Sequence, residues 1–284
     1  KMRFILYLEE DLPKNIRLPR NFEKRVFLPI WKRDDLIRKI WWEKRLLSRR
    51  AKKDGCDIFF SLYQCPTVLP KSIKHIMLVH DIVPRLFPEY QGNSRKKLYQ
   101  QLIEKAVPEA DRIIANSKRT EKDLIEHYGI KADKITVNYL DADDIFKSSV
   151  SDKTNARVLK KYKLKPGYIL AGGGLEIRKN VEGVIRSYNF LLEKKFVADL
   201  PDLVIYGKLM PGNPLALDAR KIIKELNLTK KVKLLDMVPQ EFMPALFRNS
   251  ILFIYPSFYE GFGIPVLEAM NMGKPVITSK NSSL

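Results

Sequence analysis

Short apolar runs alternate with longer segments of helical periodicity along the chain. In the first half, we predict strands at residues 4–8, 58–62, 75–79, 112–115 and 135–139. Amphipathic helices are predicted between most of them, for example at residues 97–107 and 119–128. This alternation is typical of a parallel sheet wound with helices.

The second half repeats the alternation after a polar stretch. Strands are predicted at residues 168–171, 203–206, 232–235, 251–255 and 275–278. A helix is predicted at residues 181–192, with Asn180 placed to cap its start. The intervening residues 141–165 are rich in Asp, Ser and Lys, so we place the domain boundary there. The expected architecture is α/β, with Rossmann-like parallel-sheet domains at residues 1–145 and 146–284.

Basic residues dominate the charge. Lysine and arginine outnumber the acids 52 to 33, a net charge of +19, which suits nucleic acid, an anionic membrane face or phosphorylated substrates. Residues 31–53 concentrate this charge in a predicted amphipathic helix. We favour an ordinary helix packed on a sheet over one docked on a membrane surface. The aromatic residues fall mostly in strand or helix-core positions, which disfavours nucleic acid as a partner.

Other compositional features point to a cytoplasmic protein without a membrane span. Apolar runs such as residues 76–79 and 251–255 fall far short of the roughly 20 residues that a spanning helix needs. No secretory leader is recognised at the start of the sequence. Cys56 and Cys65 show no zinc-type spacing, and we expect two idle thiols in a reducing compartment.

Polar and glycine residues gather where predicted strands end. In doubly wound sheets, ligands bind beyond the carboxyl ends of the strands. Five clusters lie at such ends: His80–Asp81, Asn116–Ser117, Gly172–Gly174, Gly207–Lys208 and residues 256–263. If two such sheets face each other, we expect these clusters to line a single cleft.

The run at residues 171–180 combines three glycines with Arg178 and Lys179 at the mouth of a helix. Glycines let backbone N–H groups approach a phosphate, and two cations neutralise a diphosphate. The run is neither a Walker loop nor Gly-x-Gly-x-x-Gly. A flexible turn before a solvated helix is the alternative reading of this run alone.

Residues 256–273 carry the strongest signal. Glu260 follows a predicted strand, and Glu268 lies eight residues on, within a helix that Pro265 can start and Gly273 can stop. Gly261 and Gly263 permit a tight turn whose N–H groups can point at an anion or a sugar hydroxyl. A carboxylate is suited to accept hydrogen bonds from vicinal hydroxyls. Two surface glutamates on a helix would leave the Gly-Phe-Gly sequence unexplained.

This segment resembles the Glu-x7-Glu signature of the retaining family-4 glycosyltransferases (glycosyl transferases group 1), which have the GT-B fold. Residues 78–89 resemble the family's loop bearing an active-site histidine, and residues 114–117 its next strand-end motif. Residues 174–180 resemble its donor-phosphate site, residues 234–239 the loop facing the nucleobase, and residues 274–279 the following strand. The likeness covers essentially the whole chain.

The resemblance implies a role for each candidate residue. Glu260 would contact the transferred sugar and Glu268 the ribose, while Arg178 and Lys179 would stabilise the leaving pyrophosphate. His80 would lie at the sugar, and the implied catalytic residues are therefore His80, Glu260, Arg178 and Lys179. The donor side would consist of Gly173, Gly174, Arg178, Lys179, Gly207, Lys208, Val238, Glu260, Gly261, Phe262, Gly263 and Glu268. The acceptor side would consist of His80, Asp81, Asn116 and Ser117.

Family members need no metal, so we expect neither a metal nor another cofactor. Asp141-Ala142-Asp143 spells the Asp-x-Asp of metal-dependent GT-A transferases, but its place in the polar linker suits a hinge and cap better. A GT-B-like protein that binds a nucleotide sugar without turnover, a GT-B epimerase or phosphorylase, and a basic nucleic-acid-binding protein remain alternatives.

The sequence of residues 176–180 resembles the corresponding segment of bacterial mannosyltransferases that build surface polysaccharide. GDP-mannose is therefore the expected donor, with UDP- or dTDP-sugars as alternatives, and a glycan or lipid-linked glycan the acceptor. Such an acceptor and the basic charge fit a protein peripheral on the inner face of the cell membrane. Family members begin with another strand before the position of Phe4 and continue beyond that of Leu284, so we expect those elements to lie outside this sequence.

Overall fold

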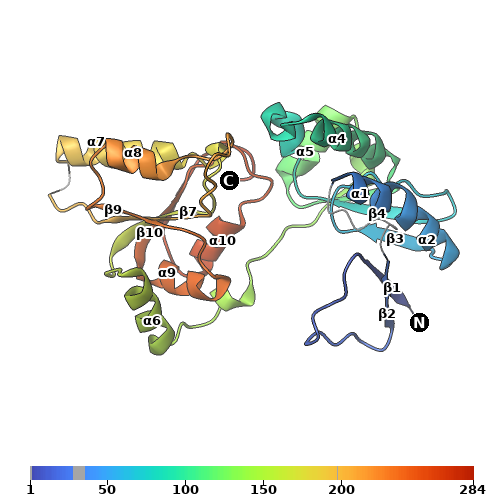
Figure 1. Ribbon diagram of the computed structural model, residues 1–284, viewed down its shortest axis with the longest axis horizontal. Coiled ribbons are helices and arrows are strands. Elements are labelled where there is room, and N and C mark those ends of the chain that lie inside the picture. Colours follow the sequence, from blue (N-terminus) through green and yellow to red (C-terminus); the bar gives the residue numbers. More distant parts are fainter. Residues whose placement is uncertain (1, 28–35, 197) are drawn as a thin grey trace. The chain divides into compact units, whose positions relative to one another are not determined.

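A computed structural model describes residues 2–27, 36–196 and 198–284. The chain divides into two compact units (Figure 1). The first contains residues through 115 together with Glu121–Val137, and the second contains Asn116–Thr120 and Asn138–Leu284. The boundary expected after residue 145 therefore lies inside the second unit.

The first unit is built on a four-stranded parallel sheet, of order β3-β4-β5-β6. Its strands are β3 (Ile58–Ser61), β4 (Lys74–Val79), β5 (Arg112–Ala115) and β6 (Ile135–Val137). Helices α4 (Ser94–Ala106) and α5 (Lys118–Tyr128) pack their apolar residues on this sheet. The strands predicted at residues 58–62, 75–79, 112–115 and 135–139 are confirmed.

The remaining strands of this unit form a separate parallel pair, β1 (Phe4–Leu8) with β2 (Phe22–Val26). The sequence predicted β1 but not β2, whose middle residues are all charged. On the outer edge of β1, the N–H and C=O groups of Ile5 and Tyr7 point away from β2. On the outer edge of β3, those of Ile58 and Phe60 point away from β4. These two edges line a largely apolar cavity of about 1020 Å³ within the unit.

A helical run connects the two sheets. It comprises α1 (Leu36–Trp41), a π-helical turn η1 (Trp42–Leu46) and α2 (Leu47–Lys53). Its buried face contributes Trp42, Leu47 and Ala51 to a core shared with Phe59 and Ile73. The predicted helix is confirmed over residues 36–53 as one packed on a sheet, while residues 31–35 lie outside the described residues. The π turn was not predicted.

The second unit is a five-stranded parallel sheet of order β11-β10-β7-β8-β9. The strands are β7 (Tyr168–Gly172), β8 (Leu203–Tyr206), β9 (Val232–Leu235), β10 (Ser250–Tyr255) and β11 (Val276–Thr278), each where a strand was predicted. Because side chains alternate along a strand, Leu170 and Ala171 reach different cores.

Helices cover both faces of this sheet (Figure 1). On one face lie α7 (Val181–Lys194) and α8 (Ala219–Glu225), and on the other α6 (Asp152–Tyr162), α9 (Met243–Asn249) and α10 (Ile264–Asn271). Helix α6 lies within the polar stretch of residues 141–165, where no helix was predicted. Ser151 caps its start by accepting from the Thr154 N–H.

Short helical turns complete the chain. They are α3 (Val83–Leu86), η2 (Pro88–Gln91), η3 (Val107–Glu109), η4 (Ala132–Lys134), η5 (Asp144–Phe146), η6 (Ile177–Lys179) and η7 (Gln240–Phe242). Asp143 caps η5 by accepting from the Ile145 N–H at 3.0 Å, and Asp141 pairs with Lys147. The cap expected there is thus confirmed. Among the helices of the described residues, none is long and apolar enough to cross a bilayer.

Candidate functional site

The site is built on a glycine turn at the carboxyl end of β7. Gly172 has a φ of +139°, and a Cβ there would lie 2.1 Å from the Tyr206 carbonyl oxygen. At the end of β8, a Cβ on Gly207 would lie 3.1 Å from the Gly174 backbone. The two strand ends therefore meet backbone to backbone, which only glycine permits.

Beside this turn, Lys179 and Glu260 form a buried ion pair. The Lys179 Nζ lies 2.7 Å from the Glu260 Oε1, and both residues are almost fully buried. The Lys179 ammonium donates to the Tyr255 hydroxyl at 2.6 Å, and that hydroxyl donates to the same Glu260 oxygen at 2.9 Å. Lysine, tyrosine and glutamate thus form a closed triangle.

Arg178 supplies a second cation to the same carboxylate. Its Nη1 lies 3.1 Å from the Glu260 Oε1 and also donates to the Tyr259 carbonyl at 2.9 Å. Its Nε lies 2.9 Å from a carboxylate oxygen of Glu176. The Arg178 carbonyl accepts from the Phe258 N–H, so backbone and side chain both tie η6 to the loop after β10.

The electrostatics of this cluster are those of a buried carboxylate between cations. Burial alone would raise the pKa of Glu260, but the charges of Lys179 and Arg178 outweigh it and leave that pKa below its ordinary value. Burial lowers the pKa of Lys179, and Glu260 partly offsets the effect. Glu260 and the more exposed Glu176 together balance the charges of the two cations.

Serines near the end of the sequence hold the backbone of Glu260. The Glu260 N–H donates to the Ser282 hydroxyl, and the Ser283 hydroxyl donates to the Glu260 carbonyl, both at 2.9 Å. The sequence did not indicate these serines, nor Tyr255, which reads as a strand residue. Only their distance from Glu260 in space identifies them.

Glu268 lies inside α10 and is almost fully buried. Burial raises the pKa of its carboxyl, the Gln240 side chain opposes the shift, and the Asp143 charge adds to it. Helix α10 begins after Gly263, whose φ of +100° is left-handed. The predicted start and end of this helix are confirmed.

The other predicted donor residues lie on neighbouring loops of the second unit. Lys208 is exposed after β8, on a loop tied to the end of β9 because Asp236 accepts from the Leu209 N–H at 2.9 Å. Val238 packs at the edge of the core that includes Phe242. Four more predicted donor residues lie in the segments that follow two strands: Gly173 and Gly174 after β7, and Gly261 and Phe262 after β10.

Asn180 does not cap α7 as predicted. It is left-handed, with a φ of +55°, and its side chain makes no capping bond. Instead, its amide donates to the Pro256 carbonyl at 3.3 Å. The residue therefore joins η6 to the loop after β10, in the same manner as Arg178.

Two of the predicted acceptor residues lie at the end of β4. The His80 Nε2 lies 3.1 Å from the Leu62 carbonyl oxygen. Asp81 accepts from the Val83 N–H at 2.9 Å at the start of α3. The other two group with the second unit, where Ser117 donates to the Gly261 carbonyl at 2.6 Å and Asn116 accepts from the Thr120 hydroxyl.

Comparison with known families decides the identity of the chain. Residues 152–284 match the family described as glycosyl transferases group 1, and residues 6–140 match glycosyltransferase family 4. The chain belongs to these glycosyltransferases.

Several relatives of this chain are named as mannosyltransferases. The O-antigen chain mannosyltransferase B of Escherichia coli is 30% identical over 209 residues, which are 72% of this chain and 52% of that protein. The O-antigen chain mannosyltransferase RfbU of Salmonella typhimurium is 27% identical over 74% of this chain and 53% of its own length. The chain spans about half the length of both.

Solved structures give the fold. WaaG, a glycosyltransferase involved in lipopolysaccharide biosynthesis, aligns with a TM-score of 0.69 at 18% identity, over 98% of this chain and 73% of its own. The sucrose-phosphate synthase of Thermosynechococcus elongatus aligns with a TM-score of 0.70 at 17% identity, over 99% and 72%. The expected GT-B fold is confirmed.

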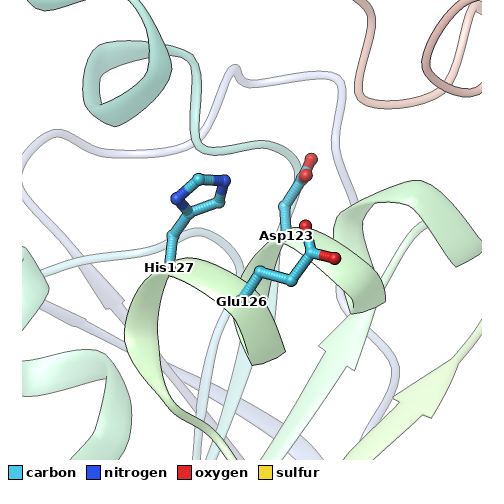
Figure 2. Close-up of side chains that lie close together, drawn as sticks. All are labelled: Asp123, Glu126 and His127. Carbon is cyan, nitrogen blue, oxygen red and sulfur yellow. The ribbon is translucent and has the colours of Figure 1, made fainter.

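Helix α5 carries one further group of possible ligands. The ligand atoms of Asp123, Glu126 and His127 all lie within 4.8 Å of one another (Figure 2). Glu126 and His127 are exposed, and Glu126 pairs with Lys122 at 3.6 Å. Their spacing places all three on one helix face, an arrangement common on solvated helices, and we assign it no metal.

Proposed function

We propose that this chain is the catalytic part of a retaining, metal-independent hexosyltransferase, which moves a hexose from a nucleoside-diphosphate sugar to a glycan or lipid-linked glycan. The observation that carries the proposal is the buried cluster in which Lys179 and Arg178 both reach Glu260 beside the glycine turn. A surface turn or an ordinary solvated helix start has no reason to bury a lysine there.

The chemistry of donor cleavage explains the two cations. When the bond between the sugar C1 and the phosphate oxygen breaks, negative charge grows on the departing diphosphate. Arg178 and Lys179 would supply preformed positive charge that stabilises that group, and they would so perform the work that a divalent cation performs elsewhere. Glu260 would contact the sugar hydroxyls, and Glu268, eight residues on, the ribose.

GDP-mannose is the donor we propose. The support is the resemblance of residues 176–180 to bacterial mannosyltransferases together with the mannosyltransferase names of two relatives. By the same resemblance, His80 would act at the transferred sugar. UDP- and dTDP-sugars are the alternative outcomes, and Anabaena HepE, a structure of the same fold, is known in complex with UDP.

The proposed acceptor would lie at the inner face of the cell membrane. Exposed Ile37 and Trp41 fall one helical turn apart on the basic run of residues 36–53, followed by exposed Lys44 and Arg45. That combination fits an anionic surface. Flotation with phosphatidylglycerol vesicles but not with phosphatidylcholine vesicles would support this part, and equal flotation or none would remove it.

Donor turnover tests the proposed reaction. The purified chain is incubated with GDP-mannose and EDTA, and the released GDP is measured. Proton NMR then identifies which anomer of free mannose forms first, before mutarotation. The proposal predicts GDP release that EDTA does not reduce and a sugar that keeps its donor configuration. Release that requires a divalent cation, or an inverted anomer, would contradict it.

A further inference from the structure

A further buried carboxylate lies in the first unit, outside the donor site. Glu43 is fully buried in the π turn η1, in the middle of the helical run. Its two oxygens accept from the hydroxyls of Tyr63, at 2.6 Å, and Tyr99, at 2.9 Å. The Lys39 ammonium lies 3.7 Å from Glu43 and over both tyrosine rings.

This carboxylate is attached to the loop that follows β3. Tyr63 belongs to that loop, so its hydroxyl ties the loop to the Glu43 side chain. Thr67, in the middle of the loop, donates to the Glu43 backbone carbonyl at 2.8 Å. A π turn disturbs the regular helical hydrogen bonds, which makes a carbonyl accessible to a side-chain donor. One residue therefore holds the loop at two points.

The same loop holds His80 on its other side. The Leu62 carbonyl contacts the His80 Nε2 at 3.1 Å. Gln64 accepts from the His80 N–H at 3.4 Å and donates to the Asp81 carbonyl at 3.0 Å. Leu62 and Gln64 flank Tyr63, so the residue that Glu43 fixes lies between the two residues that contact the His80–Asp81 segment.

The contact with Leu62 decides which tautomer His80 adopts. A carbonyl oxygen can only accept a hydrogen bond, so the Nε2 must carry the proton. In a neutral imidazole, the Nδ1 then carries the lone pair and acts as an acceptor. The position of the Leu62 carbonyl thus sets whether His80 presents a donor or an acceptor at each nitrogen.

We infer that Glu43 is a positioning residue that fixes His80 in the Nε2–H tautomer, acting through Tyr63 and the Leu62 carbonyl. The inference deepens the proposed function and rests on it for the role of His80 at the sugar. The tautomer itself is a property of the free protein, which can be measured without donor or turnover.

The two tyrosines provide a matched pair of variants. Both donate to Glu43, but only Tyr63 lies on the loop that contacts His80, whereas Tyr99 lies on α4. The chain has three histidines, so nitrogen NMR of ¹⁵N-histidine-labelled protein at a pH of about 8.5, where histidines are neutral, resolves each ring. His80→Gln assigns the signal.

The expected result is an Nε2–H ring for His80 in the wild type. Tyr63→Phe should shift its tautomer ratio about fivefold toward Nδ1–H, the effect of about one neutral hydrogen bond, and Tyr99→Phe should leave it unchanged. If Tyr63→Phe does not fold, Glu43→Gln, which keeps the side-chain shape, takes its place and should shift the tautomer ratio in the same direction. An Nδ1–H ring in the wild type, or equal effects of the two tyrosine variants, would overturn the inference. Normal tautomers without any GDP release would instead count against the proposed function alone.

Discussion

The Lys179 ammonium lies 2.7 Å from the Glu260 carboxylate, although 81 residues separate the two along the chain. The pair joins the turn after β7 to the loop after β10, and its atoms are nearly sealed from water. Buried pairs of this kind are weak stabilisers compared with apolar residues, because desolvation cancels most of the attraction. Their presence at the ends of two neighbouring strands is therefore better explained by a function than by stability.

Replacing Lys179 with Met should separate the contribution of Lys179 to stability from its contribution to the reaction. We expect a loss of roughly 1–3 kcal/mol in the free energy of unfolding, since Glu260 keeps Arg178 and Tyr255 as partners. GDP release from GDP-mannose should fall by about 10²–10³, the usual effect of removing one charge-stabilising donor. Lys194→Met, at the exposed end of α7, is the control; it removes only a contact over the Phe190 ring, so it should leave GDP release unchanged and cost less than about 1 kcal/mol of stability. A Lys179→Met variant with normal release would remove Lys179 from the mechanism.

The glycine turn should not tolerate a side chain. In Gly172→Ala, the new Cβ would meet the Tyr206 carbonyl in a left-handed backbone conformation, so calorimetry should show the second unit unfolding at a clearly lower temperature or not folding. Gly212→Ala is the matched control, because its φ is +75° but nothing lies within 4 Å of its Cβ. Equal losses in both variants would show that backbone strain alone, and not the close contact, limits this position.

Glu268→Gln should stabilise the free protein at neutral pH. Burial raises the pKa of Glu268 in the folded state, so its contribution to stability is fully present below about pH 4.5 and is lost as the pH rises through the folded pKa. Glutamine cannot ionise and avoids this loss. Urea unfolding should therefore show a gain over the wild type at pH 8 that disappears near pH 4.5, and Glu193→Gln on α7 should show none. A gain that does not change with pH would refute the argument.

The first unit should lose stability below pH 6.5 because of His75. Burial lowers the pKa of this ring to about 4, so it must stay neutral in the folded state while the unfolded chain takes up a proton. The free energy of unfolding should fall by up to about 1.4 kcal/mol per pH unit between pH 6.5 and 4. The three tryptophans all lie within residues 31–42, so their fluorescence reports on this unit. His75→Gln should flatten the dependence, whereas His127→Gln, on the exposed face of α5, should retain it.

The parallel sheets could be predicted from the sequence because their strands are continuous apolar runs separated by amphipathic helices. The predicted bounds of β5, β8 and β9 match those of the structure. Strand β2 was missed, since the charged middle of Phe22–Val26 carries no apolar run. Helix α6 was missed for a similar reason, as its sequence is largely polar and a single residue, Val158, is fully buried.

The candidate site was predictable only in part. Glycines and charged residues at strand ends are visible in a sequence, so Arg178, Lys179 and Glu260 could be named. Tyr255 could not, because a tyrosine at the end of an apolar strand looks like any core residue until its hydroxyl is seen between two charges. The opposite error occurred at Asn180, where a good capping residue is held in a left-handed conformation by its contact with Pro256.

Thermal unfolding of the purified chain with nucleotides tests the central claim most directly. GDP, UDP, dTDP and ADP, with their sugar conjugates, are each added with and without EDTA, to the wild type and to Lys179→Met and Lys194→Met. A ligand at about a hundred times its dissociation constant adds about 2.7 kcal/mol of stability. The account predicts that GDP and GDP-mannose stabilise the wild type and Lys194→Met equally with EDTA present, and that Lys179→Met loses the shift. Stabilisation by none of the nucleotides, or a shift that Lys179→Met keeps in full, would contradict it.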